Sequence, residues 1–238
     1  MHLNKEKIDL IAPALLVYAG ERETARQKGS VLFYHGLTSS KDQQEKELTS
    51  LAQRGFLAIG IDNVGHGERR YADFDRRFSG QNPDFEKALL EAVTLTAKEL
   101  PQLIDAYRRA DIIRQDKLGL IGVSMGGYIA YAAILADPRI KAAAVILGSP
   151  TWSEAPSISP DQQIERFFPT AILSQNAGQD TSVPPQAARE FHRRLAPYYA
   201  QAPERQAYIE YPESGHFMRE SDWYQCWGRA LNWLETYL

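Results

Sequence analysis

Residues 122–126 read GVSMG, which places a serine between glycines where an apolar run gives way to a helical pattern. The preceding residues, KLGLIGV at 117–123, have the composition of a buried strand, and MGGYIAYAAILA at 125–136 is typical of a helix. Glycines two positions before and two after the serine fit a sharp strand-to-helix turn that exposes a nucleophile. The free amides and positive dipole end of the helix favour an oxyanion there. Ser124 is therefore a candidate nucleophile.

A serine hydroxyl becomes a good nucleophile only when a base, usually a histidine, removes its proton. Two histidines follow Ser124 in the chain, His192 and His216. His216 lies in ESGHFMRE, a glycine-containing loop between a strand pattern and the last helical pattern. His192 lies in the middle of a helical pattern, where we expect it to be partly exposed. We predict that His216 is the base.

The histidine in turn needs a carboxylate that fixes its tautomer and stabilises its charge. Asp180 follows the apolar strand pattern at 170–175 and precedes a helical pattern, so its loop can reach over the strand ends. We predict that Asp180 is the acid. Asp161, in a segment rich in proline and serine, is the alternative, and Asp222 is expected to cap the final helix.

Acyl transfer also needs donors for the negative charge that develops on the carbonyl oxygen. One predicted donor is the backbone amide of Met125, directly after the serine. The other is the amide of Leu37 in VLFYHGLTSS, where Gly36 lets the chain turn after a strand. His35 is expected to brace this loop rather than to act as a base.

The motif DNVGHGERR at 62–70 also follows a strand pattern and contains Asp62 and His66. No second histidine or acid stands at ligand spacing, so we interpret it as a tight turn beside the site rather than a metal centre. The sequence contains neither a P-loop nor a dinucleotide glycine fingerprint. We therefore expect no cofactor and no metal.

These residues must be positioned by elements that alternate along the chain between strand and helix. Apolar strand patterns occupy 31–35, 56–62, 117–124, 141–149, 170–175 and 207–211, and helical patterns occupy 42–54, 84–109, 125–136, 185–199 and 220–237. Strands without polar alternation are covered by helices on both faces, which predicts an α/β fold with a mostly parallel central sheet. Residues 8–18 are expected to add one antiparallel edge strand.

Two longer segments interrupt this alternation. Residues 149–169 are rich in proline and serine but also carry Trp152, Phe167 and Phe168. We interpret this segment as a short cap whose three aromatic side chains line the substrate pocket, and packing of the cap onto the domain is the alternative. The segment 68–85, in which aromatic and charged residues alternate, is expected to cover a surface or a pocket.

Length and composition indicate one soluble domain that spans residues 1–238. The net charge of −3 gives no reason to expect a nucleic acid partner. The single cysteine, Cys226, cannot form an intramolecular disulfide, which fits a reducing compartment. The N-terminal residues lack a secretory pattern, and no stretch approaches the roughly 20 apolar residues of a membrane span. We expect a cytoplasmic protein without a membrane partner.

Five motifs together resemble the α/β-hydrolase superfamily: HGL at 35–37, DNVGHG at 62–67, GVSMG at 122–126, DTSVP at 180–184 and SGHF at 214–217. The resemblance covers nearly the whole chain. The stretch FYHGLTSSK and the short length are similar to small bacterial carboxylesterases related to the dienelactone-hydrolase and prolyl-oligopeptidase-like branches.

The resemblance implies Ser124 as nucleophile, His216 as base, Asp180 as acid, and the amides of Leu37 and Met125 as the oxyanion hole. Two departures stand out. The family often has His-Gly before the acid loop, where this chain has Asn176-Ala177, and a dienelactone hydrolase uses a cysteine nucleophile where this chain has a serine.

The sequence therefore predicts a serine carboxylesterase that hydrolyses short- to medium-chain esters of small molecules through an acyl-enzyme on Ser124. The same three residues also serve thioesterases, amidases, peptidases and acyltransferases, so these remain alternatives. A second class of alternative is a ligand-binding protein of the same fold with slow hydrolysis. The aromatic final helix at 220–237 is a candidate contact of a homodimer.

Overall fold

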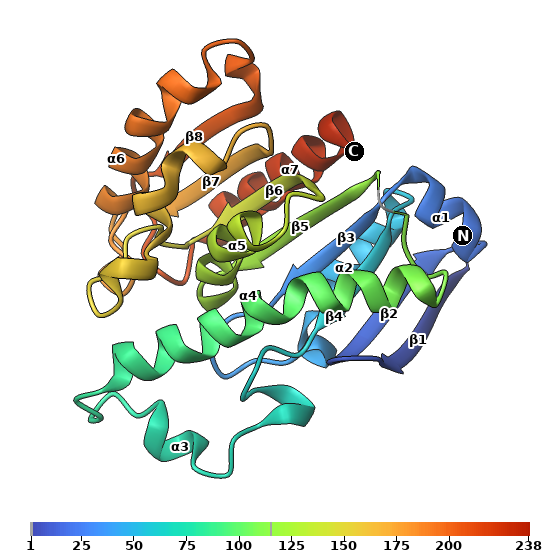
Figure 1. Ribbon diagram of the computed structural model, residues 1–238, viewed down its shortest axis with the longest axis horizontal. Helices are drawn as coiled ribbons and strands as arrows, with labels where there is room; N and C mark the ends of the chain where they lie inside the picture. Colours follow the sequence, from blue (N-terminus) through green and yellow to red (C-terminus); the bar gives the residue numbers. More distant parts are fainter. Residues whose placement is uncertain (1, 115) are drawn as a thin grey trace.

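The computed structural model describes residues 2–114 and 116–238. In these residues an eight-stranded sheet has the order β1-β2-β4-β3-β5-β6-β7-β8 (Figure 1). The strands are β1 (Leu3–Asp9), β2 (Pro13–Ala19), β3 (Ser30–Tyr34), β4 (Leu57–Ile61), β5 (Leu118–Val123), β6 (Ile140–Ile146), β7 (Ala171–Ala177) and β8 (Gln206–Tyr211). Strands β3 to β8 pair in parallel, whereas β2 pairs antiparallel with both β1 and β4. The predicted mostly parallel α/β sheet is confirmed.

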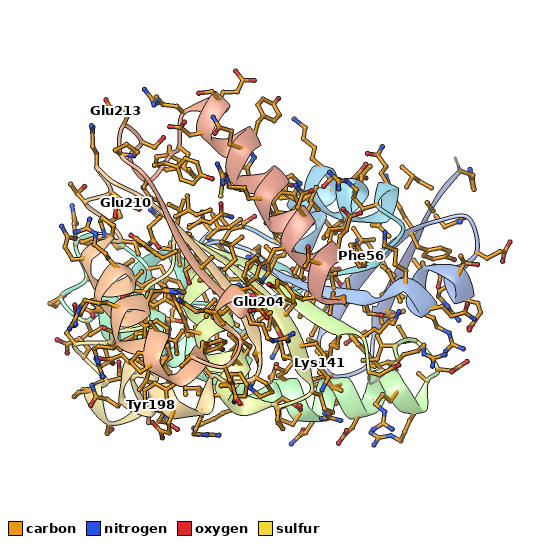
Figure 2. All side chains as sticks on the ribbon, turned by 90° about the horizontal axis from the view of Figure 1, so that it is seen from above. Phe56, Lys141, Tyr198, Glu204, Glu210 and Glu213 are labelled. Carbon is orange, nitrogen blue, oxygen red and sulfur yellow. The ribbon has the colours of Figure 1, made fainter. Side chains whose placement is uncertain are left out.

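Helices cover both faces of this sheet. They are α1 (Arg22–Lys28), α2 (Glu45–Gln53), α3 (Phe74–Arg77), α4 (Phe85–Arg109), α5 (Met125–Ala136), α6 (Gln186–Leu195) and α7 (Glu220–Tyr237). Helices α4, α5 and α6 bury side chains in one core, and α2 and α7 bury theirs in a second core on the opposite face. Figure 2, seen from above, shows α2 and α7 together on one side of the sheet, with α4 on the other.

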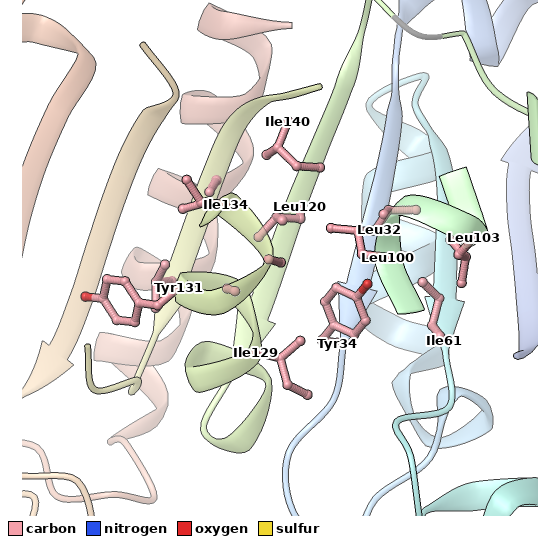
Figure 3. Close-up of a cluster of buried hydrophobic side chains, with 14 of the residues drawn as sticks. Leu32, Tyr34, Ile61, Leu100, Leu103, Leu120, Ile129, Tyr131, Ile134 and Ile140 are labelled. Carbon is pink, nitrogen blue, oxygen red and sulfur yellow. The ribbon is translucent and has the colours of Figure 1, made fainter. Parts of the chain in front are cut away.

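Successive side chains of the central strands enter the two cores in turn. In β3, Leu32 and Tyr34 enter the first core, while Val31 and Phe33 enter the second. Because successive side chains of a strand point to opposite faces, a strand covered on both faces is apolar throughout. Figure 3 shows the first core, where Leu32 and Tyr34 lie among side chains of α4 and α5. No described helix is long and apolar enough to cross a membrane.

The sheet edge differs from the prediction of a single strand at residues 8–18. Two strands form there, because β1 pairs with β2 from Leu3 opposite Ala19 to Asp9 opposite Pro13. The sequence of β1, LNKEKID, is mostly charged and contributes little to the core. Charged residues are common on edge strands, which must avoid pairing with other chains. A search for apolar runs in the sequence therefore did not find this strand, because it is mostly charged.

Candidate active site

The turn between β5 and α5 holds Ser124 in a conformation that ordinary residues seldom adopt. Ser124 has φ of 56° and ψ of −117°, outside the regions favoured by L-residues. A Cβ atom added at Gly122 would lie 1.9 Å from the Gly126 carbonyl oxygen, and one added at Gly126 would lie 2.0 Å from the Tyr34 oxygen. Only glycine fits at either position, so the spacing of the motif follows from close backbone packing.

Three predicted side chains meet at the carboxyl edge of the sheet. Ser124 follows β5, Asp180 follows β7 and His216 follows β8, and the ends of these parallel strands lie along one edge. The Ser124 Oγ atom lies 3.0 Å from His216 Nε2, and His216 Nδ1 lies 2.7 Å from Asp180 Oδ2. Figure 2 labels Glu213, which precedes His216 in the loop after β8.

The hydrogen bonds of Asp180 determine which ring nitrogen of His216 carries a proton and which one can accept a proton. The backbone amides of Ser182 and Val183 both donate to Asp180 Oδ1 at 2.9 Å. The carboxylate is completely buried and accepts the Nδ1 proton of His216 through Oδ2. The lone pair of Nε2 then faces the Ser124 hydroxyl, and it can accept the hydroxyl proton.

The loop after β3 lies directly against Ser124. A Cβ atom added at Gly36 would lie 3.6 Å from the Cβ of Ser124. His35 braces this loop: its Nε2 accepts a hydrogen bond from the Asn63 amide at 3.2 Å, and its Nδ1 lies 2.8 Å from the Gly36 carbonyl oxygen. Since a backbone amide is always a donor, Nε2 carries no proton, and Nδ1–H donates to Gly36. Burial lowers the pKa of His35 to about 4, which keeps the ring neutral.

This brace orients the amide that was predicted from the sequence as an oxyanion donor. The Gly36 carbonyl and the Leu37 amide belong to one planar peptide group and point in opposite directions. Because His35 holds the carbonyl, the Leu37 N–H points away from His35. Within residues 2–114 and 116–238, no protein acceptor takes a hydrogen bond from this amide. Met125 is the first residue of α5, where an amide has no partner within the helix.

A cavity of about 790 Å³ opens beside Ser124 and His216. Its apolar lining includes Leu37, Phe85, Leu89, Tyr128, Met218 and Trp223. The volume lies within the range of roughly 300 to 1,000 Å³ that small-molecule sites occupy. The arrangement therefore offers a base-assisted hydroxyl at the edge of a cavity suited to an apolar ligand.

The prediction that Trp152, Phe167 and Phe168 line the pocket is wrong. Trp152 and Phe167 are buried in the first core, and none of the three contributes to the described cavity lining. Phe168 packs edge-on against Tyr199, with ring centroids 5.3 Å apart. Within the segment 149–169, residues Pro160–Arg166 pack against α5 and α6, and Trp152 and Phe167 complete the core.

Two pocket residues that the sequence analysis did not identify come from the start of α4. Phe85 and Leu89 both line the cavity, and their spacing of four residues places them on one helix face. In Figure 1 the N-terminal half of α4 projects beyond the sheet together with α3. The signal available in the sequence was Phe85, an aromatic residue at the start of a long helical pattern.

His192 lies in α6, as predicted, but it is buried rather than partly exposed. Its Nε2 lies 2.8 Å from Ser174 Oγ, and its Nδ1 lies 2.9 Å from Gln206 Oε1. Burial lowers the pKa of His192 to about 4. Its hydrogen bonds join α6 to β7 and β8, so His192 is a core residue remote from Ser124.

The two other aspartates also have structural partners. Asp161 bonds the Ser159 hydroxyl and the Arg194 guanidinium. Asp222 lies in the first turn of α7 but caps no backbone amide there. Its carboxylate instead accepts a hydrogen bond at 2.7 Å from Ser214 Oγ, two residues before His216. Asp222 therefore fixes the loop that carries the histidine.

The 62–70 motif forms a turn held by a buried ion pair. The Asp62 carboxylate accepts hydrogen bonds from the Lys41 amide at 2.9 Å, from Lys41 Nζ at 3.0 Å and from the Glu68 amide at 2.9 Å. His66 Nδ1 lies 3.1 Å from the Val64 carbonyl oxygen. Among the described residues, no cluster of three or more histidine, cysteine or acidic side chains is arranged to hold a metal ion.

Comparison with known proteins places more than half of the chain in a family. The model of the family described as serine aminopeptidase S33 matches residues 25–173. A candidate esterase of Bacillus subtilis strain 168, YitV, is 25% identical over 237 residues, covering 87% of this chain and 89% of that protein. The esterase YjfP of Escherichia coli K12 is 30% identical over 138 residues, covering 58% of this chain and 51% of its own length.

The architecture also matches a solved structure over nearly the full length. The crystal structure of TT1662 from Thermus thermophilus superposes with a TM-score of 0.81, at 20% sequence identity and with 99% of each chain covered. At this identity the likeness supports the fold, and the chemistry must be argued from the site itself.

Proposed function

The chain belongs to the serine aminopeptidase S33 family of α/β-hydrolases, and we propose that within it the protein is a serine carboxylesterase acting on short- to medium-chain esters. The hydrogen-bonded series from Ser124 through His216 to Asp180, beside an apolar cavity, is the observation that carries this proposal. The esterase names of the relatives YitV and YjfP support an ester rather than a peptide substrate.

In the proposed acylation, the Ser124 Oγ attacks the ester carbonyl carbon while His216 Nε2 takes the hydroxyl proton. The amides of Leu37 and Met125 bind the negative oxygen of the tetrahedral intermediate. The bond between the acyl carbon and the alcohol oxygen then breaks. His216 delivers its proton to that oxygen, and the alcohol leaves.

Deacylation repeats these steps with water as the nucleophile. His216 Nε2 accepts a proton from water, and the resulting hydroxide attacks the acyl carbon. The bond to Ser124 Oγ breaks, the proton returns to Ser124, and the carboxylic acid is released. Asp180 stays ionised and stabilises the protonated ring in both halves of the cycle.

Labelling with a fluorophosphonate, with mass mapping of the adduct, tests this proposal when it is run beside hydrolysis of p-nitrophenyl esters of increasing acyl length. We expect an adduct on Ser124 and rapid turnover of short and medium chains. The variant Ser124→Ala should lose both while remaining folded. Full activity in Ser124→Ala would overturn the mechanism.

Other results would identify the alternatives. An adduct on Ser124 without ester turnover would indicate a thioester, amide or peptide substrate, and no adduct would indicate a ligand-binding protein with slow chemistry. A strong preference for long acyl chains would contradict the proposed chain-length range.

We also propose that residues 1–238 form one domain that acts in the cytoplasm and associates as a homodimer through α7. Cys226 is buried in α7, which suits a reducing compartment. Tyr224 on the same helix is well exposed and available for a contact between copies. Sedimentation as a monomer at all accessible concentrations would remove the dimer proposal.

A further inference from the structure

The cavity beside Ser124 has two walls that come from opposite faces of the sheet. Phe85, Leu89 and Tyr128 line it from the side where they pack against the core of α4 and α5. Met218 and Trp223 line it from the side where they pack against the core beneath α7. Ser124 lies at the sheet edge between them, so a bound substrate contacts both walls.

The chemistry proposed above decides which part of an ester faces each wall. His216 Nε2 must deliver its proton to the leaving oxygen, so the alcohol must lie next to the loop that carries His216. Met218 follows in that same loop, and Trp223 lies in the first turn of α7. The carbonyl oxygen is held at Leu37 and Met125. The acyl chain is then left with the opposite wall, formed by α4 and Tyr128 of α5.

Both walls lack charge. No aspartate, glutamate, lysine or arginine of the described chain lines this cavity. The neighbouring charged side chains have other partners: Glu86 accepts a hydrogen bond from Ser153, and Arg219 bonds Asp222. An ammonium or carboxylate that leaves water without gaining a partner loses its hydration uncompensated. A substrate with a charged acyl group would therefore bind here at a large disadvantage.

We propose, on the basis of the esterase function above, that the protein selects uncharged esters whose acyl chain lies against Phe85 and Leu89 of α4 and whose alcohol lies against Met218 and Trp223. The start of α4 is then the determinant of acyl specificity. The α7 wall selects the leaving group and has no contact with the acyl chain.

The assignment of the acyl chain to one wall and the alcohol to the other can be tested by kinetics, because every ester of one acid forms the same acyl-enzyme. A substitution on the α7 wall changes acylation, measured by kcat/KM, but leaves the rate of deacylation unchanged. A substitution on the α4 wall changes both steps, since the acyl chain is still bound after the alcohol has left.

The matched variants Leu89→Ala and Met218→Ala test the assignment, since each truncates one partly buried apolar side chain of one wall. The substrates are p-nitrophenyl butyrate, hexanoate and octanoate, with 4-methylumbelliferyl hexanoate as a second leaving group. We expect Leu89→Ala to shift the octanoate-to-butyrate ratio of kcat/KM about tenfold, as one or two methylenes in an apolar pocket do. Met218→Ala should change only the ratio between the two leaving groups.

A shift in chain-length preference in Met218→Ala together with none in Leu89→Ala would overturn the assignment. The conservative variant Phe85→Leu provides a second test of the same wall if Leu89→Ala does not fold. It should also alter the deacylation rate, measured from the burst and steady-state phases, and an unchanged rate in a folded α4-wall variant would count against the proposal.

The charge requirement is tested with two esters of similar length. We expect mono-p-nitrophenyl glutarate, which carries a carboxylate, to have a kcat/KM roughly 100-fold below that of p-nitrophenyl pentanoate. Equal values would overturn the uncharged substrate class. Fluorophosphonate labelling of every variant distinguishes a failure of the esterase function from a failure of the wall assignment. Absence of labelling at Ser124 in the unaltered protein contradicts the esterase function. Normal labelling of the variants with unshifted specificity contradicts only the wall assignment.

Discussion

At the scale of single residues, the hydrogen bonds of Asp180 make the substitution Asp180→Asn informative. The amides of Ser182 and Val183 donate to Oδ1, so an asparagine must keep its amide oxygen there and present its NH₂ group to His216. The ring would then carry its proton on Nε2 and could not accept one from Ser124. We expect kcat for p-nitrophenyl butyrate to fall about 10⁴-fold, with little change in the urea midpoint.

Asp161→Asn is the matched control for this experiment. Asp161 is also a buried aspartate, and the sequence made it the alternative acid, but the structure gives it Ser159 and Arg194 as partners. Its kcat should stay within about twofold of the unaltered protein, since charge changes away from the reacting atoms have small effects on the chemical step. Loss of activity in Asp161→Asn with retention in Asp180→Asn would reverse the assignment.

The brace formed by His35 leads to a different kinetic outcome. In His35→Gln the Gly36 carbonyl loses its ring donor and keeps only the Ser39 amide at 3.3 Å, so the Leu37 amide is held less firmly in its orientation. Removal of one oxyanion donor costs about 10² to 10³-fold, so misdirection of the amide should lower kcat by about 10 to 10²-fold. The pH profile of kcat/KM should keep its shape and position, because the proposed base, His216, is unchanged in this variant. A displaced pH profile would show that His35 takes part in proton transfer.

Sequence spacing was sufficient to predict that Ser124, Asp180 and His216 meet, because each follows a strand of one parallel sheet. The burial of His192 was not predictable in this way. Its partners Ser174 and Gln206 lie on β7 and β8, and their proximity arises only when α6 packs on the sheet. Local pattern therefore identifies residues at strand ends better than polar groups in the core.

At the scale of elements, the ion pair between Lys41 and Asp62 links the segment after β3 to the turn after β4. Both side chains are almost completely buried. Removal of one partner leaves an uncompensated buried charge, which typically costs about 3 to 5 kcal/mol. We expect Lys41→Met to lower the free energy of unfolding in urea by this amount. Lys46→Met, on the exposed side of α2, should change it by less than about 0.5 kcal/mol.

If Lys41→Met and Lys46→Met had equal stability, the buried pair would contribute nothing to holding the turn. Activity in Lys41→Met offers a second measurement. Lys41→Met removes the Nζ bond to Asp62 and leaves only the backbone amides of Lys41 and Glu68 as donors to that carboxylate. The loop that carries Leu37 should therefore loosen, and kcat should fall even at temperatures where the variant stays folded.

The segment 149–169, which the sequence predicted to be a cap, shows why the wall of the pocket was not predicted. Aromatic residues in the irregular segment 149–169 suggested a pocket, yet Trp152 and Phe167 complete the core. The pocket wall is instead provided by α4, whose Phe85 and Leu89 extend the helix face past the sheet. Composition identifies apolar side chains that must be covered, but only the packing of α4 on α5 decides whether protein or ligand covers them.

At the scale of the whole molecule, buried neutral histidines make the free energy of unfolding depend on pH. Burial lowers the pKa of both His35 and His192 to about 4, whereas a histidine in an unfolded chain titrates near 6.5. As the pH falls from about 6.5 toward 4, the unfolded chain binds protons that the native protein does not. The free energy of unfolding should therefore fall with decreasing pH in this window, by up to about 1.4 kcal/mol per pH unit for each histidine.

Urea denaturation at a series of pH values between 7.5 and 4.5 measures this dependence directly. Above pH 7 the histidine contribution is constant, because both states are then neutral at these positions. In His192→Gln one of the buried histidines is removed, so the slope between pH 6.5 and 5 should decrease by up to about 1.4 kcal/mol per unit even though the variant is less stable at pH 7.5. A slope that is unchanged in His192→Gln would mean that His192 binds its proton equally in both states, which its hydrogen bonds to Ser174 and Gln206 within the core argue against.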